Sequence, residues 1–468
     1  MQIFHGDGSP DIFALYSGDL GERMLSYASG MELCKIEVLN KHFSELTTDA
    51  WVTVTNDRFG MKNGKEGWKL GTSFLRKPVF IYINMSPDHH SMYYAGFPNV
   101  TSHNSLFAVV TDVREDEDYE APEGINMYNA NNLKYIGYLE QDGSRTTMAG
   151  PAGDEVFITN NNHDLSFCRH NFDEQYIHYA NNMARNVPVL GCRTHVIVVT
   201  GNTLKLYKLT SNTNDSTYVL ECQSVSLGRA CNNDDIDENG FTNEYFNNSI
   251  SWGPNEFDFV VYHSVDNWRD GVPGTCEISV WGLDALANQI TRTQYIEARI
   301  GLENVAMSED FIVGASKDKK MHVWNRHTKE KLPYILCDVD EEDELDDDVI
   351  ISPICMSIHG HILVANSHLG AALCIWNVKT GQLLRKYNDA VEEGRTDLLP
   401  DGPDASSMAY LKQLNGFILT TGYLNVWAFP TNQVQKDKVL AIRTREEDLR
   451  QNARNERPVI GLPDGEED

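Results

Sequence analysis

The chain has 468 residues, of which 41% are hydrophobic and 23% are charged, and these proportions are those of an ordinary globular protein. Its formal net charge of -29 would repel the phosphate backbone of a nucleic acid unless a local basic patch overcame it, and the sequence shows no such patch. No stretch approaches the roughly 18 consecutive apolar residues of a membrane span, so we expect neither nucleic acid nor membrane as a partner.

The start of the chain and its cysteines indicate a compartment. Residues 1–11 have neither a basic beginning nor a long apolar run, so we expect no secretory signal and no transit peptide. The nine cysteines are spread singly, mostly within apolar segments, and none forms a CxxC pair. This pattern is typical of reduced core residues, and it predicts a cytoplasmic and/or nuclear protein.

Residues 11–60 have a character of their own, because apolar side chains recur there at helical spacing. Leu20, Met24 and Leu25 fall on one face of a first helix, Gly30 interrupts the pattern, and a second apolar periodicity follows the glycine. The segment therefore predicts a small all-α module made of short consecutive helices.

The order of features in this module resembles an F-box. The first amphipathic helix and the break at Gly30 are followed by a helix with Leu33 and Val38, a basic-aromatic step at 41–43 and a closing tryptophan, Trp51. F-boxes commonly begin with a Leu-Pro pair, and this chain has Tyr16-Ser17 at the corresponding positions. A serine there is able to cap the first helix, because its hydroxyl accepts a hydrogen bond from a free backbone amide.

The resemblance implies that an apolar face of the module docks to a Skp-type adaptor. The alternative is a structural cap, in which the helices pack on the remainder of the chain. By position in the F-box pattern, the adaptor-binding residues would be Leu20, Met24, Leu25, Leu33, Ile36, Val38, Leu39 and Phe43.

After a predicted linker at residues 61–77, the chain changes to strand patterns that begin with 78–84. The clearest copy of a recurring pattern is 311–331, where an apolar run, a small-residue stop, a charged turn and an alternating run end in Trp324. This is the pattern of a β-hairpin. Hairpins of this kind end at seven aromatic residues, Tyr128, Phe167, Tyr207, Trp281, Trp324, Trp376 and Trp427.

Most steps between these aromatics are near the roughly 40 to 50 residues of one propeller blade, and the longer step from Tyr207 to Trp281 indicates an insertion. The repeats resemble the WD-repeat family at Lys317-Asp318, which precedes Trp324, and at Gly360-His361. The tryptophans are followed by Asn325, Gly282, Asn377 and Ala428, never by aspartate. The resemblance therefore implies a divergent WD-repeat-like propeller.

The fold class expected is mainly β, a seven-bladed β-propeller over residues 78–443 preceded by the F-box-like module. The charged tail at 444–468 is expected to start as a helix and to end disordered. Two segments are candidates for the strand that closes the ring. One is 78–84 from the amino-terminal side, and the other is 438–443 from the carboxyl-terminal side.

Three polar inserts, at 112–123, 232–248 and 338–348, are predicted to be solvated loops, and for 338–348 the alternative is a docking site for a basic partner. Residues 235–240 match the first half of a calcium loop, but Phe246 stands where the bidentate glutamate belongs, so a solvated loop is expected. The pairs His89-His90 and His163-Asp164 have no spaced companions, and no zinc site is expected. Trp252 and Trp268 lie outside the hairpin positions and either pin a long loop or bind a partner.

Together the two resemblances imply the substrate receptor of an SCF-type cullin-RING ubiquitin ligase. Its partners would be the Skp-type adaptor with the ligase core and an unknown protein substrate. We expect no catalytic residue, cofactor or metal, because the ubiquitin chemistry of such ligases belongs to other subunits. The alternatives are a non-catalytic propeller scaffold in another assembly and a propeller hydrolase with a metal in its channel.

Overall fold

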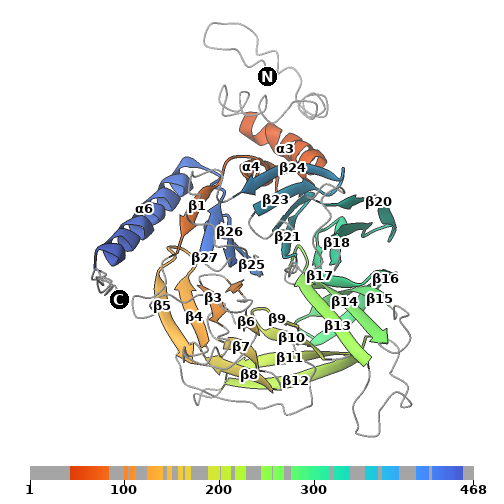
Figure 1. The fold of residues 1–468 in the computed structure, drawn as a ribbon. Helices are drawn as coiled ribbons and strands as arrows, with labels where there is room; N and C mark the ends of the chain where they lie inside the picture. Colours follow the sequence, from red (N-terminus) through yellow and green to blue (C-terminus); the bar gives the residue numbers. More distant parts are fainter. Residues whose placement is uncertain are drawn as a thin grey trace, which may run out of the picture.

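The computed structural model of the chain describes residues 43–83, 100–103, 106–111, 124–140, 145–149, 156–161, 164–169, 188–200, 202–211, 217–227, 244–255, 257–267, 276–316, 320–337, 354–366, 372–388, 407–420 and 424–456. Most of these residues belong to antiparallel sheets arranged around a common centre (Figure 1).

The first three sheets in the ring come from the first half of the chain. They are β2 to β5 (Val100–His103, Leu106–Thr111, Gly124–Asn129, Tyr135–Glu140), β6 to β8 (Arg145–Ala149, Val156–Asn161, Asp164–Arg169) and β9 to β12 (Val189–Gly191, His195–Thr200, Thr203–Ser211, Thr217–Ser226).

The other four sheets follow in chain order. They are β13 to β16 (Glu244–Trp252, Asp258–Asn267, Cys276–Asp284, Gln289–Glu297), β17 to β20 (Leu302–Met307, Phe311–Ser316, Met321–Asn325, Lys331–Leu336), β21 to β24 (Met356–His359, Ile362–Asn366, Ala372–Asn377, Gln382–Asn388), and β25 to β27 (Ser407–Leu411, Gly416–Thr420, Leu424–Ala428) completed by β1 (Val79–Tyr82).

The first strands of successive sheets contact one another in turn, from β2 through β6, β9, β13, β17 and β21 to β25, which again contacts β2. This closed series makes the fold a β-propeller. Six of the sheets have four strands, and the sheet of β6 to β8 has three described strands. The expectation of seven like blades is therefore corrected to six complete four-stranded blades and one three-stranded sheet within the described part of the chain.

The ring is closed by an amino-terminal strand. β1 pairs antiparallel with β27, with Phe80 opposite Trp427, and so becomes the outer strand of the last sheet. This confirms the first of the two candidate closing segments. The second is wrong as a strand, because 438–443 lies inside helix α6 (Gln433–Glu456). Asn432 caps this helix, since its Oδ1 accepts from the amide of Gln435 at 2.9 Å.

The predicted closing aromatics all lie on the third strand of a sheet, as Trp324 does on β19. The six whose side chains are described are buried, and Trp324 is 2% exposed. In five sheets a register shift interrupts the pairing of the third and fourth strands next to this aromatic, as between Val280 and Trp281. Such a bulge twists the strand and turns a large ring into the space between sheets. The burial of Trp324, Trp376 and Trp427 is thus confirmed.

The turns after these third strands repeat a geometry that the sequence analysis did not recognise. In the sheet of β17 to β20, Asn325 Oδ1 accepts from the amides of His327 and Thr328, and Lys329 has a φ of 64°. The same combination of an Asn or Asp and a positive φ four residues later occurs at Asn129, Asp284 and Asn377. Asparagine in place of the aspartate of regular WD repeats therefore still performs a turn-forming role.

Two helices precede the ring. Helix α3 (Phe43–Phe59) packs against α4 (Gly64–Ser73), which lies within the predicted linker. Glycine is a poor helix former, and this explains why the sequence of α4 was read as a connection. Its Gly67 and Gly71 are buried against Thr55 and Phe59 of α3, where a larger side chain would hold the helices apart.

Several predictions fall on stretches that the structure does not describe. The inserts at 112–123 and 338–348, the partial calcium motif at 235–240, the pair His89-His90 and the tail from 457 lie outside the described residues. The prediction for the insert at 232–248 is partly corrected, because its last five residues, 244–248, belong to strand β13. The outer limits of the predicted domains stay predictions.

Candidate functional site: the junction between the helix pair and the propeller

Of the eight predicted adaptor-binding residues, only the last, Phe43, belongs to the described part of the chain. Residues 20 to 39 of that set lie outside the described residues. Phe43 is the first residue of α3, and its side chain is not described. What the structure does show is how α3, the last part of the F-box-like segment, is attached to the ring.

The end of α3 meets a hairpin turn of the propeller at backbone distance. Gly60 ends the helix with a φ of 63°, and its amide donates to Asn56 O at 2.8 Å. The turn between β21 and β22 contains Gly360, with a φ of 60°, and the amide of His361 donates to Phe59 O at 2.6 Å. A Cβ atom on Gly60 would overlap the His361 ring, and a Cβ atom on Gly360 would overlap Phe59 O. Both glycines are therefore required by the close approach.

Apolar contacts continue the junction along α4. Phe74, directly after α4, is fully buried, and its ring centroid lies 5.4 Å from that of His359 and 5.9 Å from that of Phe417. Phe59 and Met61 belong to the same cluster as Ile362 and Phe417. A side chain from each helix end is thus part of the core between the last two sheets.

Hydrogen bonds fix the end of α4. The Tyr387 hydroxyl donates to Arg76 O at 2.9 Å, and Asn415 Nδ2 donates to Ser73 Oγ at 2.9 Å. Asn415 is buried and has a φ of 46° in the turn between β25 and β26. Since buried polar groups need partners, these bonds favour one orientation of the helix pair on the ring.

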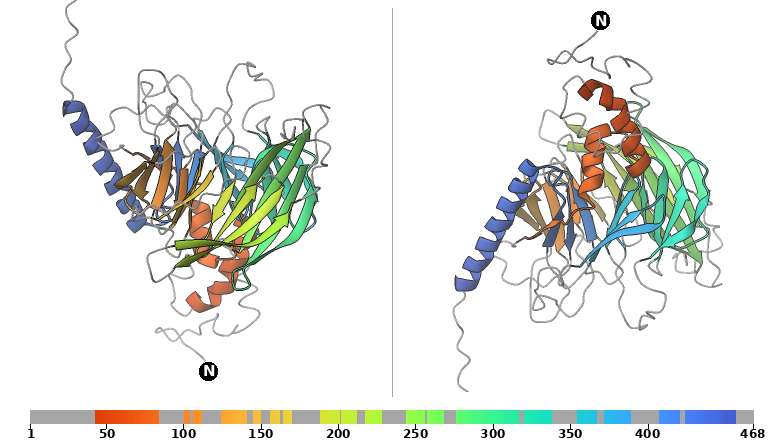
Figure 2. Two further views of the ribbon diagram at one scale, coloured as in Figure 1. Left: turned by 90° about the horizontal axis from the view of Figure 1, so that it is seen from below. Right: turned by 90° about the horizontal axis from the view of Figure 1, so that it is seen from above.

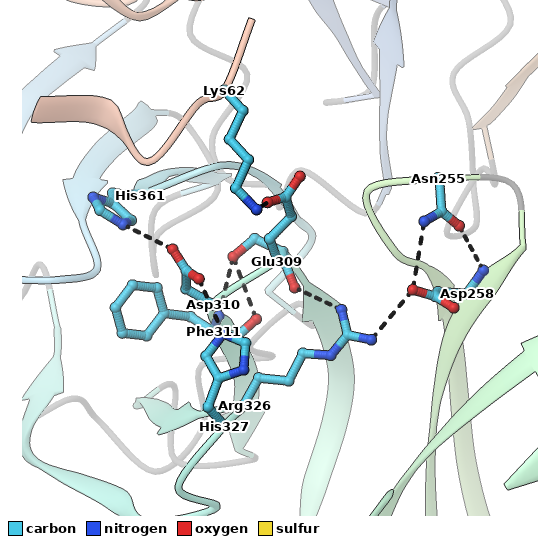
Figure 3. A network of polar contacts seen from close by, with 10 residues as sticks. Lys62, Asn255, Asp258, Glu309, Asp310, Phe311, Arg326, His327 and His361 are labelled. Carbon is cyan, nitrogen blue, oxygen red and sulfur yellow. Dashed lines mark hydrogen bonds and ion pairs between the residues drawn. The ribbon is translucent and has the colours of Figure 1, made fainter. Parts of the chain in front are cut away.

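A polar network surrounds this contact on the same face (Figure 3). Asp310, in the turn between β17 and β18, accepts from His361 Nε2 at 3.3 Å and from His327 Nε2 at 3.1 Å. Next to it, Glu309 forms an ion pair with Lys62, which lies between α3 and α4. The network therefore links the helix pair to two neighbouring sheets.

The charges in the network follow from burial. Burial lowers the pKa of His361, although the hydrogen bond to Asp310 partly opposes this, so the imidazole is neutral near pH 7. Burial alone would raise the pKa of Asp310, but the hydrogen bonds with His327 and His361 lower it below its usual range. In the neutral imidazole of His361, Nε2 carries the hydrogen atom, and this N–H donates a hydrogen bond to the carboxylate of Asp310.

The network extends one sheet further. Arg326 pairs with Asp258 at 3.2 Å and reaches Ser308 O at 3.4 Å, and Asn255 Nδ2 donates to Asp258 at 3.5 Å (Figure 3). Polar contacts thus run along one face, from Lys62 to the turn between β13 and β14.

Sequence reasoning misread one motif at this junction. Gly360-His361 was taken as the remnant of a WD-repeat pair, but the structure places it in the turn against which α3 ends. Two isolated glycines at 60 and 360 carry no local signal of their contact. Trp252 has a structural role, since its Nε1 donates to Gly191 O of the neighbouring sheet at 3.1 Å. Trp268 lies outside the described residues.

Neither a metal site nor a spanning helix is found in the part of the chain that the structure describes. No group of three or more His, Cys, Asp or Glu side chains is arranged there to hold a metal ion. No helix among the same residues is long and apolar enough to cross a membrane.

Comparisons with known proteins assign neither a family nor a function to the chain. No protein-family model and no curated protein matches the chain. Among solved structures, the β-propeller domain of Cps50 (Swd1) from Myceliophteria thermophila is 11% identical, with a TM-score of 0.44, over 75% of this chain and 100% of that one. Hsv2 from Kluyveromyces lactis with its complete loop 6CD is 14% identical, with a TM-score of 0.38, over 69% of this chain and 90% of that one. At these values the comparisons name no function.

Proposed function

We propose that this protein is a substrate receptor of an SCF-type ubiquitin ligase, in which residues 11–60 bind a Skp-type adaptor and the propeller binds a protein substrate. The observation that supports this proposal is the attachment of α3 to the ring. A receptor has to present its substrate in a fixed relation to the remainder of the ligase, and the Gly60 to Gly360 contact removes the freedom of a flexible linker.

A second proposal is a non-catalytic scaffold in which the helices serve as a structural cap. It is favoured by the apolar contacts of Phe59, Met61 and Phe74, which are satisfied by the propeller itself. In this case α3 and α4 complete the fold of the ring and need no other chain. The two proposals differ in what the residues before α3 bind.

The test is co-purification of the full-length chain with a Skp-type adaptor from its own cells, with ubiquitin transfer blocked. The receptor proposal expects the adaptor with the wild type and its loss with Leu25→Asp or Val38→Asp, because a charge in an apolar interface lacks a partner. Val434→Asp is the matched control, since this α6 side chain is 80% exposed. The full chain is required because α3 and α4 have their packing partners in the ring.

If the wild type never retains the adaptor, the receptor proposal fails and the scaffold proposal replaces it. If both aspartate variants lose the adaptor and also unfold, their circular dichroism and melting will differ from those of Val434→Asp. Loss of the adaptor with unchanged melting supports docking through the amino-terminal segment.

A further inference from the structure

Two large apolar side chains are exposed at one end of the sheet of β13 to β16. Phe257 is 57% exposed in the turn before β14, and Leu286 is 97% exposed in the turn between β15 and β16. The first and third turns of an antiparallel sheet lie at the same end, and Leu283 N donates to Phe257 O at 2.6 Å. The two side chains therefore belong to one surface, which we call the Phe257–Leu286 surface.

The backbone under this surface is held by side-chain caps. Asn255 Oδ1 accepts from the amides of Phe257 and Asp258, both at 2.9 Å. Asp284 Oδ1 accepts from the amide of Leu286 at 3.0 Å and from that of Ala287 at 2.9 Å. These bonds hold the amides of residues 257, 258, 286 and 287 in place, so a partner loses less binding free energy in ordering them.

The fold of the turn does not require a leucine at this position. The equivalent positions in three other sheets, two residues after the capping Asn, are Asn131, His327 and Lys379. Single exposed apolar residues are common on protein surfaces, but an aromatic and a leucine on two adjoining turns form the kind of anchor that concentrates binding free energy.

The surroundings specify the charge of the partner. Among the described residues of 253–258 and 284–289, Asp258 and Asp284 are acidic and none is Lys or Arg, within a chain of net charge -29. Arg326 lies nearby, but its guanidinium is paired with Asp258 and its side chain is 15% exposed. A partner with Lys or Arg beside its apolar side chains would therefore complement this surface.

The surface also adjoins an interface already described. Asp258 and Asn255 are the end of the polar network that begins at Lys62 beside the helix pair (Figure 3). The Phe257–Leu286 surface thus lies on the face of the ring where α3 and α4 are attached. A protein bound to this surface would be held on the same side of the ring as α3 and α4.

We propose that the Phe257–Leu286 surface is a docking site for a polypeptide segment that carries apolar side chains flanked by Lys or Arg. This inference rests on the proposed protein-binding function of the propeller and names its binding face and the class of its partner. It does not depend on whether the amino-terminal segment binds an adaptor.

The experiment is selection from a display library of random short peptides on the full-length wild-type protein, followed by fluorescence anisotropy of the enriched peptides. We expect enriched sequences that combine Leu, Ile or an aromatic residue with flanking Lys or Arg. Leu286→Asp and Phe257→Ala should weaken their binding at least about tenfold, which is the loss of one interface anchor. Val434→Asp is the control for a charge introduced at an exposed apolar position elsewhere.

The proposal is overturned if no peptide is enriched, or if the enriched peptides bind Leu286→Asp as tightly as they bind the wild type. It is also overturned if Val434→Asp weakens binding equally, or if a Lys-Ser peptide without apolar residues competes equally well, because general charge attraction then explains the binding. The adaptor co-purification is scored separately. Peptide binding without adaptor co-purification contradicts the ligase-receptor proposal and supports the Phe257–Leu286 docking site. Adaptor co-purification without peptide binding supports the ligase-receptor proposal and contradicts the docking site.

Discussion

The propeller carries two helical additions, and they are attached in different ways. The α3–α4 pair meets the ring at two glycines and contributes Phe74 to the core between the last two sheets. Helix α6 runs along the outside of the ring, whereas α3 and α4 lie against one face (Figure 2). It contacts the closing strand β1 through side chains, chiefly Val439 and Ile442.

The difference shows two ways to complete a closed ring. The α3–α4 pair is bound through backbone groups, so any side chain added at the contact forces the two parts apart. Helix α6 covers the outer strand of the last sheet, whose unpaired edge would otherwise be available to another strand. Arg450 lies over the ring of Tyr82 at 4.6 Å and Arg445 donates to Asn132 O at 2.7 Å, and contacts of this kind tolerate adjustment.

The largest effect is expected for Gly360→Val, which tests the backbone contact between the α3–α4 pair and the ring. Position 360 has a φ of 60°, which valine adopts only with strain, and the added side chain would overlap Phe59 O. We therefore expect a loss of about 4 kcal/mol or more in the free energy of unfolding, or release of the helix pair. Urea denaturation and limited proteolysis near residues 60–63 measure these outcomes. Gly301→Val is the control, because a Cβ atom at Gly301 meets nothing within 4 Å. Equal stability of the two variants would refute the backbone contact.

Acid should weaken the attachment of the helix pair. Burial lowers the pKa of His359, which packs against Phe74, from 6.5 to about 4. The unfolded chain therefore takes up this proton at higher pH than the folded chain, and the stabilisation is complete above about pH 6.5 and is lost as the pH falls toward 4. The loss is roughly 3 kcal/mol. His359→Phe should flatten this part of the stability profile, and an unchanged profile would contradict the assignment.

A substitution in the side-chain contacts of α6 should lower the free energy of unfolding less than Gly360→Val does. Val439→Ala removes two buried methyl groups without a backbone clash, and we expect a loss of about 2 kcal/mol. Leu440→Ala on the same turn serves as the control, because Leu440 is 39% exposed and its truncation should cost less than about 0.5 kcal/mol. A larger effect for Val439→Ala than for Gly360→Val would reverse the comparison.

The smallest effect is expected at the ion pair of Lys62 and Glu309. Both side chains are substantially exposed, so Lys62→Ala should change the free energy of unfolding by less than about 0.5 kcal/mol. The same measurement in high salt should show no further change, because backbone and apolar contacts hold the helix pair. A loss comparable to that of Val439→Ala would mean that charge contributes more than the geometry indicates.

Much of the ring was predictable, because each third strand ends its apolar alternation in a large aromatic such as Trp324, and that pattern is local. The closing strand at 78–84 was recognisable as a strand, but its partner lies near residue 427, and no local pattern distinguishes it from 438–443. Helix α4 was not recognised because glycine is a poor helix former. Close packing against α3 explains the presence of Gly64, Gly67 and Gly71 in this helix. The junction could not be foreseen, since its contacts join residues about three hundred positions apart, as between Tyr387 and Arg76.

The closing strand also determines the order in which the chain can fold. β1 leaves the ribosome long before β27, its partner in the last sheet, and Ser73 waits for Asn415, 342 residues later. Until then Phe74 lacks Phe417 and Phe429, against which its ring packs, and loop closure of this length is costly and slow. Docking of the helix pair and closure of the ring are therefore late, coupled events of synthesis, and a nascent chain stalled before residue 429 exposes both a strand edge and an apolar helix pair to chaperones.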